Sequence, residues 1–284
     1  MKNFRESVIQ YLGEEYKKKD GELKVLPNGK WYGNGHPEGK EYSHILPDKK
    51  DRRNILKEFR DCFYKSEQSK PKPEKIKYHR FFHHLNSSQA MCINFFFPLI
   101  KKNKLDVILQ ALNITDDKVD YTTVAFEKES DIEKEKGYRP TNFDFYFETT
   151  NNKKFYFEIK YTEEGFGKAK DDEEHEKKYT DVYCEAAKSK IEENTKSCFL
   201  GHYQLMRNLI HVSKNDYVVF VVPEQNESVY KQVKDAEIFV KKEFRENVKI
   251  LTWDTLYKNE YINNGELKLY YETFKKKYVI YDNN

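Results

Sequence analysis

Two neighbouring stretches in which aromatic and polar residues alternate constrain the fold of this chain most strongly. In residues 142–147 (Asn-Phe-Asp-Phe-Tyr-Phe) phenylalanine occupies every second position, and Asp144 lies on the intervening row. Residues 155–160 (Phe-Tyr-Phe-Glu-Ile-Lys) repeat the pattern, with Glu158 and Lys160 on the polar row. Side chains alternate across a β-strand, so each stretch predicts a strand with an apolar core face and a polar opposite face.

The connection between these strands predicts an antiparallel hairpin and its register. Asn151 and Asn152 form a good turn pair, but a tight two-residue turn there would put Asp144 opposite an apolar residue. The register shifted by one residue puts Asp144 opposite Glu158 and needs an odd-length loop or a bulge near Asn151. It also pairs the apolar rows, as Phe143–Ile159, Phe145–Phe157 and Phe147–Phe155. We predict this second register, in which repulsion raises one carboxyl pKa unless a cation lies between the two groups.

The residue types on the polar face are suited to phosphodiester hydrolysis. Asp144 and Glu158 would supply oxygen ligands for a hard divalent cation, Mg²⁺ with Mn²⁺ as a substitute. Such an ion polarises a phosphate oxygen and activates water, while Lys160 would help to deprotonate or orient that water or offset charge on the phosphate. A solvated face with cross-strand ion pairs is the alternative, because Glu-x-Lys occurs six times in the chain. The prediction therefore rests on the whole arrangement.

The remaining patterns predict a mixed α/β fold. A run of apolar residues at 217–222 is typical of a strand buried on both faces. Residues 163–193 predict a loop followed by a solvated helix. Further strands are predicted at 121–128, 142–148, 154–161 and 249–253, and helices at 87–102, 202–211 and 228–245. An early meander followed by crossover connections implies a mixed central sheet.

The N-terminal part of the chain differs in charge from the rest. Residues 1–80 carry 20 Lys and Arg against 13 Asp and Glu, a net charge of +7, although the whole chain carries only +3. We predict a basic N-terminal extension at 1–75, with helices at 4–18 and 49–65 around a glycine-rich loop at 27–40, and a core domain at 76–284. The extension would approach a polyanion, with Trp31 or Tyr32 close by; a lysine-rich surface is the plain alternative.

Composition excludes several classes of protein. No apolar run approaches the roughly 20 residues of a membrane-spanning helix, and no signal peptide follows Met1. The four cysteines form no Cys-x-x-Cys pair, so we expect a cytoplasmic protein without a disulfide framework. His79, His83 and His84 cluster locally, but no second metal-binding motif accompanies them, which favours a structural role.

The arrangement of Asp144 followed by Glu158, Ile159 and Lys160, after a helix and a first strand, resembles the PD-(D/E)XK nuclease superfamily. The runs 139–144 (Arg-Pro-Thr-Asn-Phe-Asp) and 157–163 (Phe-Glu-Ile-Lys-Tyr-Thr-Glu) are similar to a poorly characterised bacterial restriction-endonuclease-like family. Residues 87–90 and 203–207 are similar to it as well. The resemblance spans about residues 78–255. It implies a restriction-endonuclease-like α/β fold with helices on a mixed central sheet.

The resemblance also implies roles for individual residues. Asp144 and Glu158 would bind Mg²⁺, and Lys160 would be catalytic. Superfamily members often add an acidic residue from the preceding helix; here that helix offers only Gln89 at its start, and Glu127 on the first strand is an alternative metal ligand. Gln204 would reach the catalytic site, or would form a helix-surface pair with Arg207 one turn away.

These expectations define a metal-dependent endonuclease acting on DNA in the cytoplasm. A homodimer or two binding events would be needed for two cuts on opposite strands. Two alternatives share the fold: a catalytically silent nucleic-acid-binding protein, and a protein-interaction subunit of a defence or mobile-element system. The three charged residues on the polar face argue against the silent alternative.

Overall fold

The computed structural model describes residues 3–33 and 35–279. The chain forms two compact units, of which unit 1 comprises Met1–Leu105 with Tyr257–Asn284 and unit 2 comprises Asp106–Leu256. The domain boundary expected from the sequence, at residue 75, lies inside unit 1. Unit 1 also includes a second segment, which begins at Tyr257. The composition of the sequence did not indicate a boundary there.

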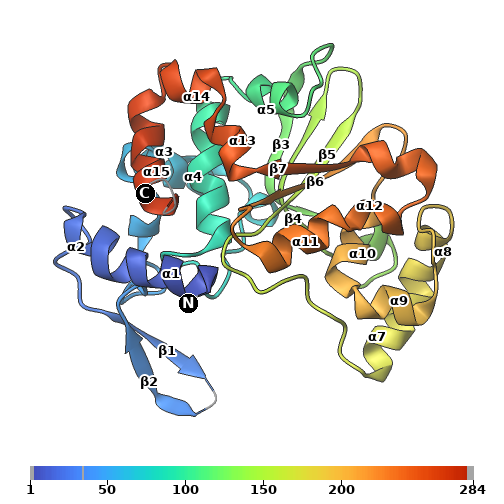
Figure 1. Cartoon of the computed structure of the whole chain (residues 1–284), viewed down its shortest axis with the longest axis horizontal. Helices are drawn as coiled ribbons and strands as arrows, with labels where there is room; N and C mark the ends of the chain where they lie inside the picture. Colours follow the sequence, from blue (N-terminus) through green and yellow to red (C-terminus); the bar gives the residue numbers. More distant parts are fainter. Residues whose placement is uncertain (1–2, 34, 280–284) are drawn as a thin grey trace. The chain divides into compact units, whose positions relative to one another are not determined.

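Unit 2 is built on a five-stranded mixed sheet in the order β3-β4-β5-β6-β7 (Figure 1). The strands are β3 (Val119–Glu129), β4 (Asn142–Thr149), β5 (Lys154–Ile159), β6 (Asp216–Val222) and β7 (Val248–Thr252). The first three strands form an antiparallel meander, β6 pairs with β5 in parallel, and β7 pairs with β6 in parallel. All five predicted strands are confirmed, and their ends differ from the predicted ones by at most two residues.

The β4–β5 hairpin has the predicted register. Phe145 pairs with Phe157 and Phe147 with Phe155, and the pairing continues to Glu148 with Lys154. Thr149 and Lys153 close a three-residue loop, in which Asn152 adopts a φ of +58°. A three-residue loop ending in a left-handed residue is a common hairpin connection, and Asn tolerates that conformation better than most residues. The predicted odd-length loop is therefore confirmed.

The prediction that Phe143 continues the phenylalanine row is wrong. The pairing of β4 with β5 ends at Phe145 and Phe157, so neither the predicted pair of Asp144 with Glu158 nor that of Phe143 with Ile159 forms in the ladder. The Phe143 ring packs instead against Tyr156 and His211, with ring centroids 4.8 Å apart in both contacts. The pairing of β4 with β5 thus ends before Asp144, although β4 stays paired with β3 on its other side.

Helices cover the face of the sheet that carries Glu158. The apolar core on this face joins Val218, Phe220 and Val222 of β6 to side chains of the helices α8–α12. The other face of β6 is also fully buried at Val219 and Val221, which confirms the prediction for this strand. The helical segments of unit 2 are α5 (Asp106–Ala111), α6 (Asp131–Glu135), α7 (Glu173–Lys178), η4 (Tyr179–Tyr183), α8 (Cys184–Lys188), α9 (Lys196–Gly201), α10 (Tyr203–Leu209), α11 (Glu227–Lys234), α12 (Ala236–Phe239), η5 (Lys242–Asn247) and α13 (Trp253–Tyr257).

The single helix predicted at 228–245 is broken into α11, α12 and η5. Val240 interrupts it in an extended conformation and forms an isolated antiparallel bridge with Ile191. A tertiary pairing thus overrides the local helical pattern.

Unit 1 combines helices with a two-stranded hairpin. The predicted loop at 27–40 is instead the hairpin of β1 (Gly29–Gly33) and β2 (His36–Tyr42) (Figure 1). Lys30 and Tyr32 of β1 are exposed. The predicted helix at 49–65 begins later, because the Leu56 backbone is extended and donates to the Asn94 side chain. The helical segments are α1 (Phe4–Gln10), η1 (Tyr11–Tyr16), α2 (Lys17–Lys19), η2 (Arg52–Asn54), α3 (Lys57–Ser69), η3 (Lys72–Glu74), α4 (Ser88–Lys101), α14 (Glu260–Asn264) and α15 (Lys268–Tyr278).

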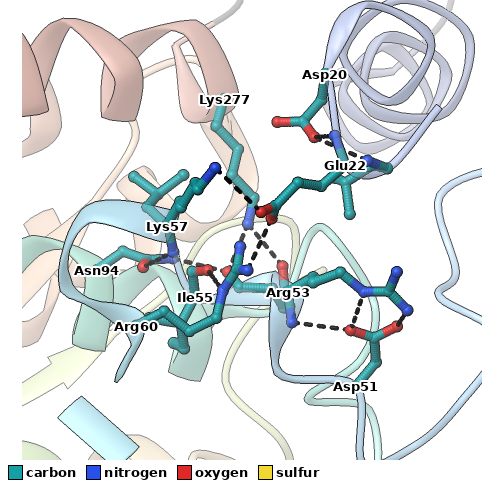
Figure 2. Close-up of polar contacts among 12 residues, drawn as sticks. Asp20, Glu22, Asp51, Arg53, Ile55, Lys57, Arg60, Asn94 and Lys277 are labelled. Carbon is teal, nitrogen blue, oxygen red and sulfur yellow. Dashed lines mark hydrogen bonds and ion pairs between the residues drawn. The ribbon is translucent and has the colours of Figure 1, made fainter. Parts of the chain in front are cut away.

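Lys277 of α15 is fully buried and makes polar contacts within unit 1 (Figure 2). The Lys277 ammonium donates to the backbone oxygen and the side-chain oxygen of Asn54, both at 2.7 Å. Nearby, Glu22 pairs with Arg60 at 2.7 Å and with Lys57 at 3.6 Å (Figure 2). Part of the basic charge of the N-terminal segment is therefore matched inside the unit.

Among residues 3–33 and 35–279, no helix combines the length and apolar character needed to cross a membrane.

Candidate active site

Asp144 lies where β4 and β5 separate. Its Oδ2 accepts a hydrogen bond from the backbone N–H of Ile159 at 2.7 Å, just beyond the last paired residues, Phe145 and Phe157. A side-chain acceptor has thus replaced a backbone acceptor at the end of the ladder. The hydrogen bond fixes the Asp144 carboxylate between the two strands, close enough to Glu158 for the two charges to interact.

Three donors from the same unit hold the Glu158 carboxylate. Its Oε1 is 2.8 Å from the Lys160 ammonium and 2.8 Å from Nε2 of Gln204, and its Oε2 accepts from Nδ2 of Asn208 at 3.1 Å. Gln204 and Asn208 are one turn apart on α10, so both amides project toward the same carboxylate. Glu158 is only 5% exposed, and its orientation is therefore set by β5 and α10 together.

Lys160 follows β5 and remains attached to the sheet, because its backbone N–H donates to Val221 at 3.0 Å. Its ammonium lies 5.1 Å from the centre of the Phe166 ring. Burial alone would lower the pKa of Lys160, but the carboxylates of Glu158, Glu163 and Asp144 outweigh it and raise the pKa above its usual value. The side chain is therefore a cation at neutral pH.

The pKa of Asp144 is raised well above its usual value. Burial is the largest cause, and the negative charges of Glu158 and Glu127 add to it. The N–H of Ile159 and the charge of Lys160 oppose the shift without cancelling it. Asp144 is therefore a carboxyl group whose ionisation a nearby cation would favour.

Glu127 approaches Asp144 from the other neighbouring strand. In the β3–β4 register its neighbours Phe126 and Lys128 pair with Phe145 and Phe143, which places it beside Asp144. Glu127 has a φ of +56°, an uncommon conformation for a residue with a long side chain. Such local strain often marks functional sites. Three adjacent strands thus each bring one carboxylate to this region.

Gln89, the alternative to Glu127, has its polar groups engaged within unit 1. Its Oε1 accepts from the backbone N–H of His79 at 2.9 Å, and its Nε2 donates to the backbone oxygen of Lys77 at 3.2 Å. Its contacts hold a loop in place.

The donor chemistry fits a hard divalent cation bound by few protein ligands. Carboxylate oxygens are the ligands that Mg²⁺ prefers, and it usually binds one or two of them while retaining water and substrate oxygens. Within the described part of the chain, no group of three or more His, Cys, Asp or Glu residues is arranged to hold a metal. The residues fit an ion held by Asp144 and Glu158, with Glu127 near, rather than a closed protein cage.

Several contributors were not anticipated from the sequence. Asn208 is fully buried and donates to Glu158; its spacing of four residues from Gln204 was the available signal. Glu133 of α6 is also fully buried and accepts from Thr141 and Tyr183, with the Arg207 guanidinium 3.4 Å away. Nothing in the local sequence distinguishes Glu133 from the other acidic residues of its helix.

The segment after β5 is anchored to the helices around it. Phe166 is 9% exposed and packs on Phe220, while its backbone N–H donates to Gln232 at 2.9 Å. Gln204 Oε1 lies 3.4 Å from the backbone N–H of Gly167, which links the loop to the site.

A cavity of about 510 Å³ opens beside Glu158. Its wall is formed by residues 139–142, by the loop at Gly167 and Lys168, and by side chains of α7 and α10. Glu158 lines this cavity together with Gln204, whose side-chain amide donates to the Glu158 carboxylate.

A mixed five-stranded sheet flanked by helices, with Asp144, Glu158 and Lys160 gathered at the separated ends of two strands, defines a restriction-endonuclease-like protein. A family model described as "Restriction Endonuclease associating with ARP" matches residues 13–279. The chain belongs to this family, and the membership indicates a nuclease-like function. No curated protein and no solved structure gives a significant match to the chain.

Proposed function

We propose that this chain is a metal-dependent nuclease that hydrolyses DNA phosphodiester bonds. The observation that carries the proposal is the position of Asp144, fixed between two strands and repelled by the carboxylate of Glu158. Burying two like charges together is costly unless a cation offsets them. A nuclease centre that binds a divalent cation accounts for that cost.

Asp144 and Glu158 would hold the ion, Mg²⁺ or in its place Mn²⁺, and the nearby carboxylate of Glu127 would add negative charge that favours its binding. When bound, the ion supplies Lewis-acid polarisation of the phosphate and lowers the pKa of an attacking water. Asn208 keeps the Glu158 carboxylate in place throughout, and Gln204 orients it from the side that opens to the cavity.

The positive charge of Lys160 favours stabilisation of the phosphate over deprotonation of water as its role. Because neighbouring carboxylates raise its pKa, the ammonium would not take a proton from water at neutral pH. It would instead offset the negative charge that develops on the phosphate oxygens during hydrolysis.

The exposed Lys30 and Tyr32 of the β1–β2 hairpin, together with the net charge of +7 in residues 1–80, support an approach of DNA to this part of the chain. Cleavage of both strands would require a homodimer or two successive binding events.

Nicking of supercoiled plasmid in the presence of Mg²⁺ or Mn²⁺ tests the proposal. We expect Glu158→Gln to abolish nicking, because it retains the shape of the side chain but removes the charge. The matched control is Glu185→Gln, which removes an exposed carboxylate from α8 of the same unit. A folded Glu158→Gln protein that nicks DNA as fast as the wild type would contradict the proposed centre.

The family description, which names an association with ARP, favours a second candidate, a protein-interaction subunit of the same fold. Failure of the wild-type chain to nick with either ion, on duplex, single-stranded and branched DNA, would support this candidate.

A further inference from the structure

The cavity beside Glu158 has a wall rich in cations. Arg139, Lys168, Lys178 and Arg207 all line it, against the two carboxylates of Glu158 and Glu174. Glu158 is already paired with Lys160, which does not line the cavity. The wall therefore carries an excess of positive charge, and it attracts an anion.

Contacts with Glu133 and Tyr203 hold the Arg207 side chain in position. Its guanidinium is 3.4 Å from Oε1 of the fully buried Glu133 and 5.0 Å from the centre of the Tyr203 ring. Burial alone would raise the pKa of Glu133, but hydrogen bonds from Ser130 and Thr141 and the charge of Arg207 lower it overall. A buried, ionised carboxylate thus fixes the guanidinium at the cavity wall, as expected of a preorganised binding group.

Lys178 reaches the same cavity from α7. Its ammonium donates to the backbone oxygen of Arg139 at 2.8 Å and lies over the rings of Tyr138 and Tyr183 at 5.9 and 5.5 Å. Burial, followed by the charge of Arg207, lowers the pKa of Lys178. Two cations from different helices therefore repel each other across this cavity, and an anion between them would relieve the repulsion.

We propose that this cavity binds a phosphate group of the nucleic acid next to the phosphodiester that is cleaved, with Lys178 and Arg207 as its principal contacts. A guanidinium fork and an ammonium are the groups that bind phosphate most commonly. Arg207 is one helical turn from Gln204, which touches Glu158, so the phosphate site adjoins the proposed centre. The inference rests on the proposed function for the identity of the neighbouring phosphodiester.

The bound phosphate is either a terminal monoester or an internal diester of the strand. A terminal phosphate would make the chain select strand ends, whereas an internal phosphate would position any continuous strand. The chemistry of the contacts is the same, so the two sources are distinguished by the ends of the DNA probe.

Binding of short fluorescein-labelled DNA to the full chain, measured by fluorescence anisotropy in EDTA, tests the inference without cleavage. The probes carry a 5′-phosphate, a 3′-phosphate or hydroxyl ends. We expect Lys178→Gln to weaken binding roughly tenfold, since it removes a hydrogen bond to a charged group. The slope of log affinity against log salt should fall by about 0.7 for a single strand. Lys231→Gln, which removes an exposed charge from α11, should bind as the wild type does.

If the site takes a terminal phosphate, the wild type loses affinity when that phosphate is omitted, and Lys178→Gln no longer distinguishes the probes. If it takes an internal phosphate, Lys178→Gln loses the same affinity on every probe. Arg207→Lys keeps the charge beside Glu133 but lacks the fork, and it should lose part of the affinity. Unchanged affinity and salt slope in a folded Lys178→Gln protein would overturn the inference.

The result is separable from that of the nuclease proposal. A wild-type chain that binds DNA through Lys178 but never nicks it would contradict the nuclease and retain the phosphate site. If Lys178→Gln nicks DNA as fast as the wild type, the result would retain the nuclease and contradict the phosphate site.

Discussion

The carboxylate of Asp144 accepts a hydrogen bond of 2.7 Å from the backbone N–H of Ile159, just beyond the end of the β4–β5 pairing. This one hydrogen bond accounts for two features. It gives a hydrogen-bond acceptor to the N–H of Ile159, which has no ladder partner on β4. A buried N–H without an acceptor would destabilise the fold. It also holds Asp144 close enough to Glu158 for the repulsion to raise the pKa of Asp144.

Asp144→Asn should stabilise the metal-free protein. The folded-state pKa of Asp144 lies above its ordinary value of 3.8, so the wild type loses stability as pH rises from about 4 through that raised pKa. At neutral pH the neutral amide avoids this loss, and we expect Tm in EDTA to rise by a few degrees. Mg²⁺ should raise Tm of the wild type but not of the variant.

The exposed Asp171 provides the control, because Asp171→Asn removes an equal charge away from β4 and β5. Thermal unfolding in EDTA and in Mg²⁺ measures both effects. An Asp144→Asn protein less stable than the wild type in EDTA would contradict the repulsion described here.

Two substitutions at Glu127 separate backbone strain from charge. Relief of the left-handed conformation, about 1–2 kcal/mol, should exceed the roughly 0.5–1 kcal/mol entropic cost of glycine. We therefore expect Glu127→Gly to be more stable than Glu127→Gln, by up to about 1 kcal/mol in urea unfolding. Both variants should cleave DNA more slowly if the carboxylate serves the proposed ion. Equal stability of the two variants would argue against strain at this position.

Asn208 and Gln204 donate to the same carboxylate but should differ in their effect on stability. Asn208 is fully buried, so Asn208→Ala leaves Glu158 short of a donor and should cost about 1–3 kcal/mol. Gln204 faces the cavity, where water can replace it, and Gln204→Ala should cost less than about 1 kcal/mol. Fluorescence of the buried Trp253 in a Trp31→Phe background reports unfolding of unit 2. An equal or reversed order of the two losses would contradict the assignment.

Lys277 should give unit 1 a distinctive pH dependence. Burial lowers its pKa to about 7 in the folded protein, whereas the unfolded value is 10.5. Between these values the unfolded chain binds more protons, so the contribution of Lys277 to stability rises with pH. The free energy of unfolding of the wild type minus that of Lys277→Met should increase from pH 7 to 10, by at most about 1.4 kcal/mol per pH unit. Lys276→Met, which removes an exposed neighbour, should show no such trend.

Local patterns predicted much of unit 2. The alternation of phenylalanine defined β4 and β5, and pairing of their apolar rows gave the correct register and an odd-length loop. Burial of large aromatic side chains outweighs turn preference, so this register was accessible without coordinates. The interruption at Phe143 was not accessible, since it depends on contacts with Tyr156 and with His211 from a distant segment.

Other elements depended on partners far along the chain. The break at Val240 requires Ile191, and the late start of α3 requires Asn94. Residues 27–40 were predicted as a loop because closely spaced glycines mark tight turns, yet they form a hairpin.

The sequence by itself determined which residues share a sheet face and that Asp144, Glu158 and Lys160 belong to one region, because strand periodicity is a local property. Only the tertiary structure decided that Gln204 and Asn208 hold Glu158, that Glu133 fixes Arg207, and that a cavity lined by cations adjoins them. Those contacts join segments dozens of residues apart. Their formation depends on how α6, α7 and α10 pack on the sheet, and the burial that drives this packing leaves no local periodicity in the residues that meet.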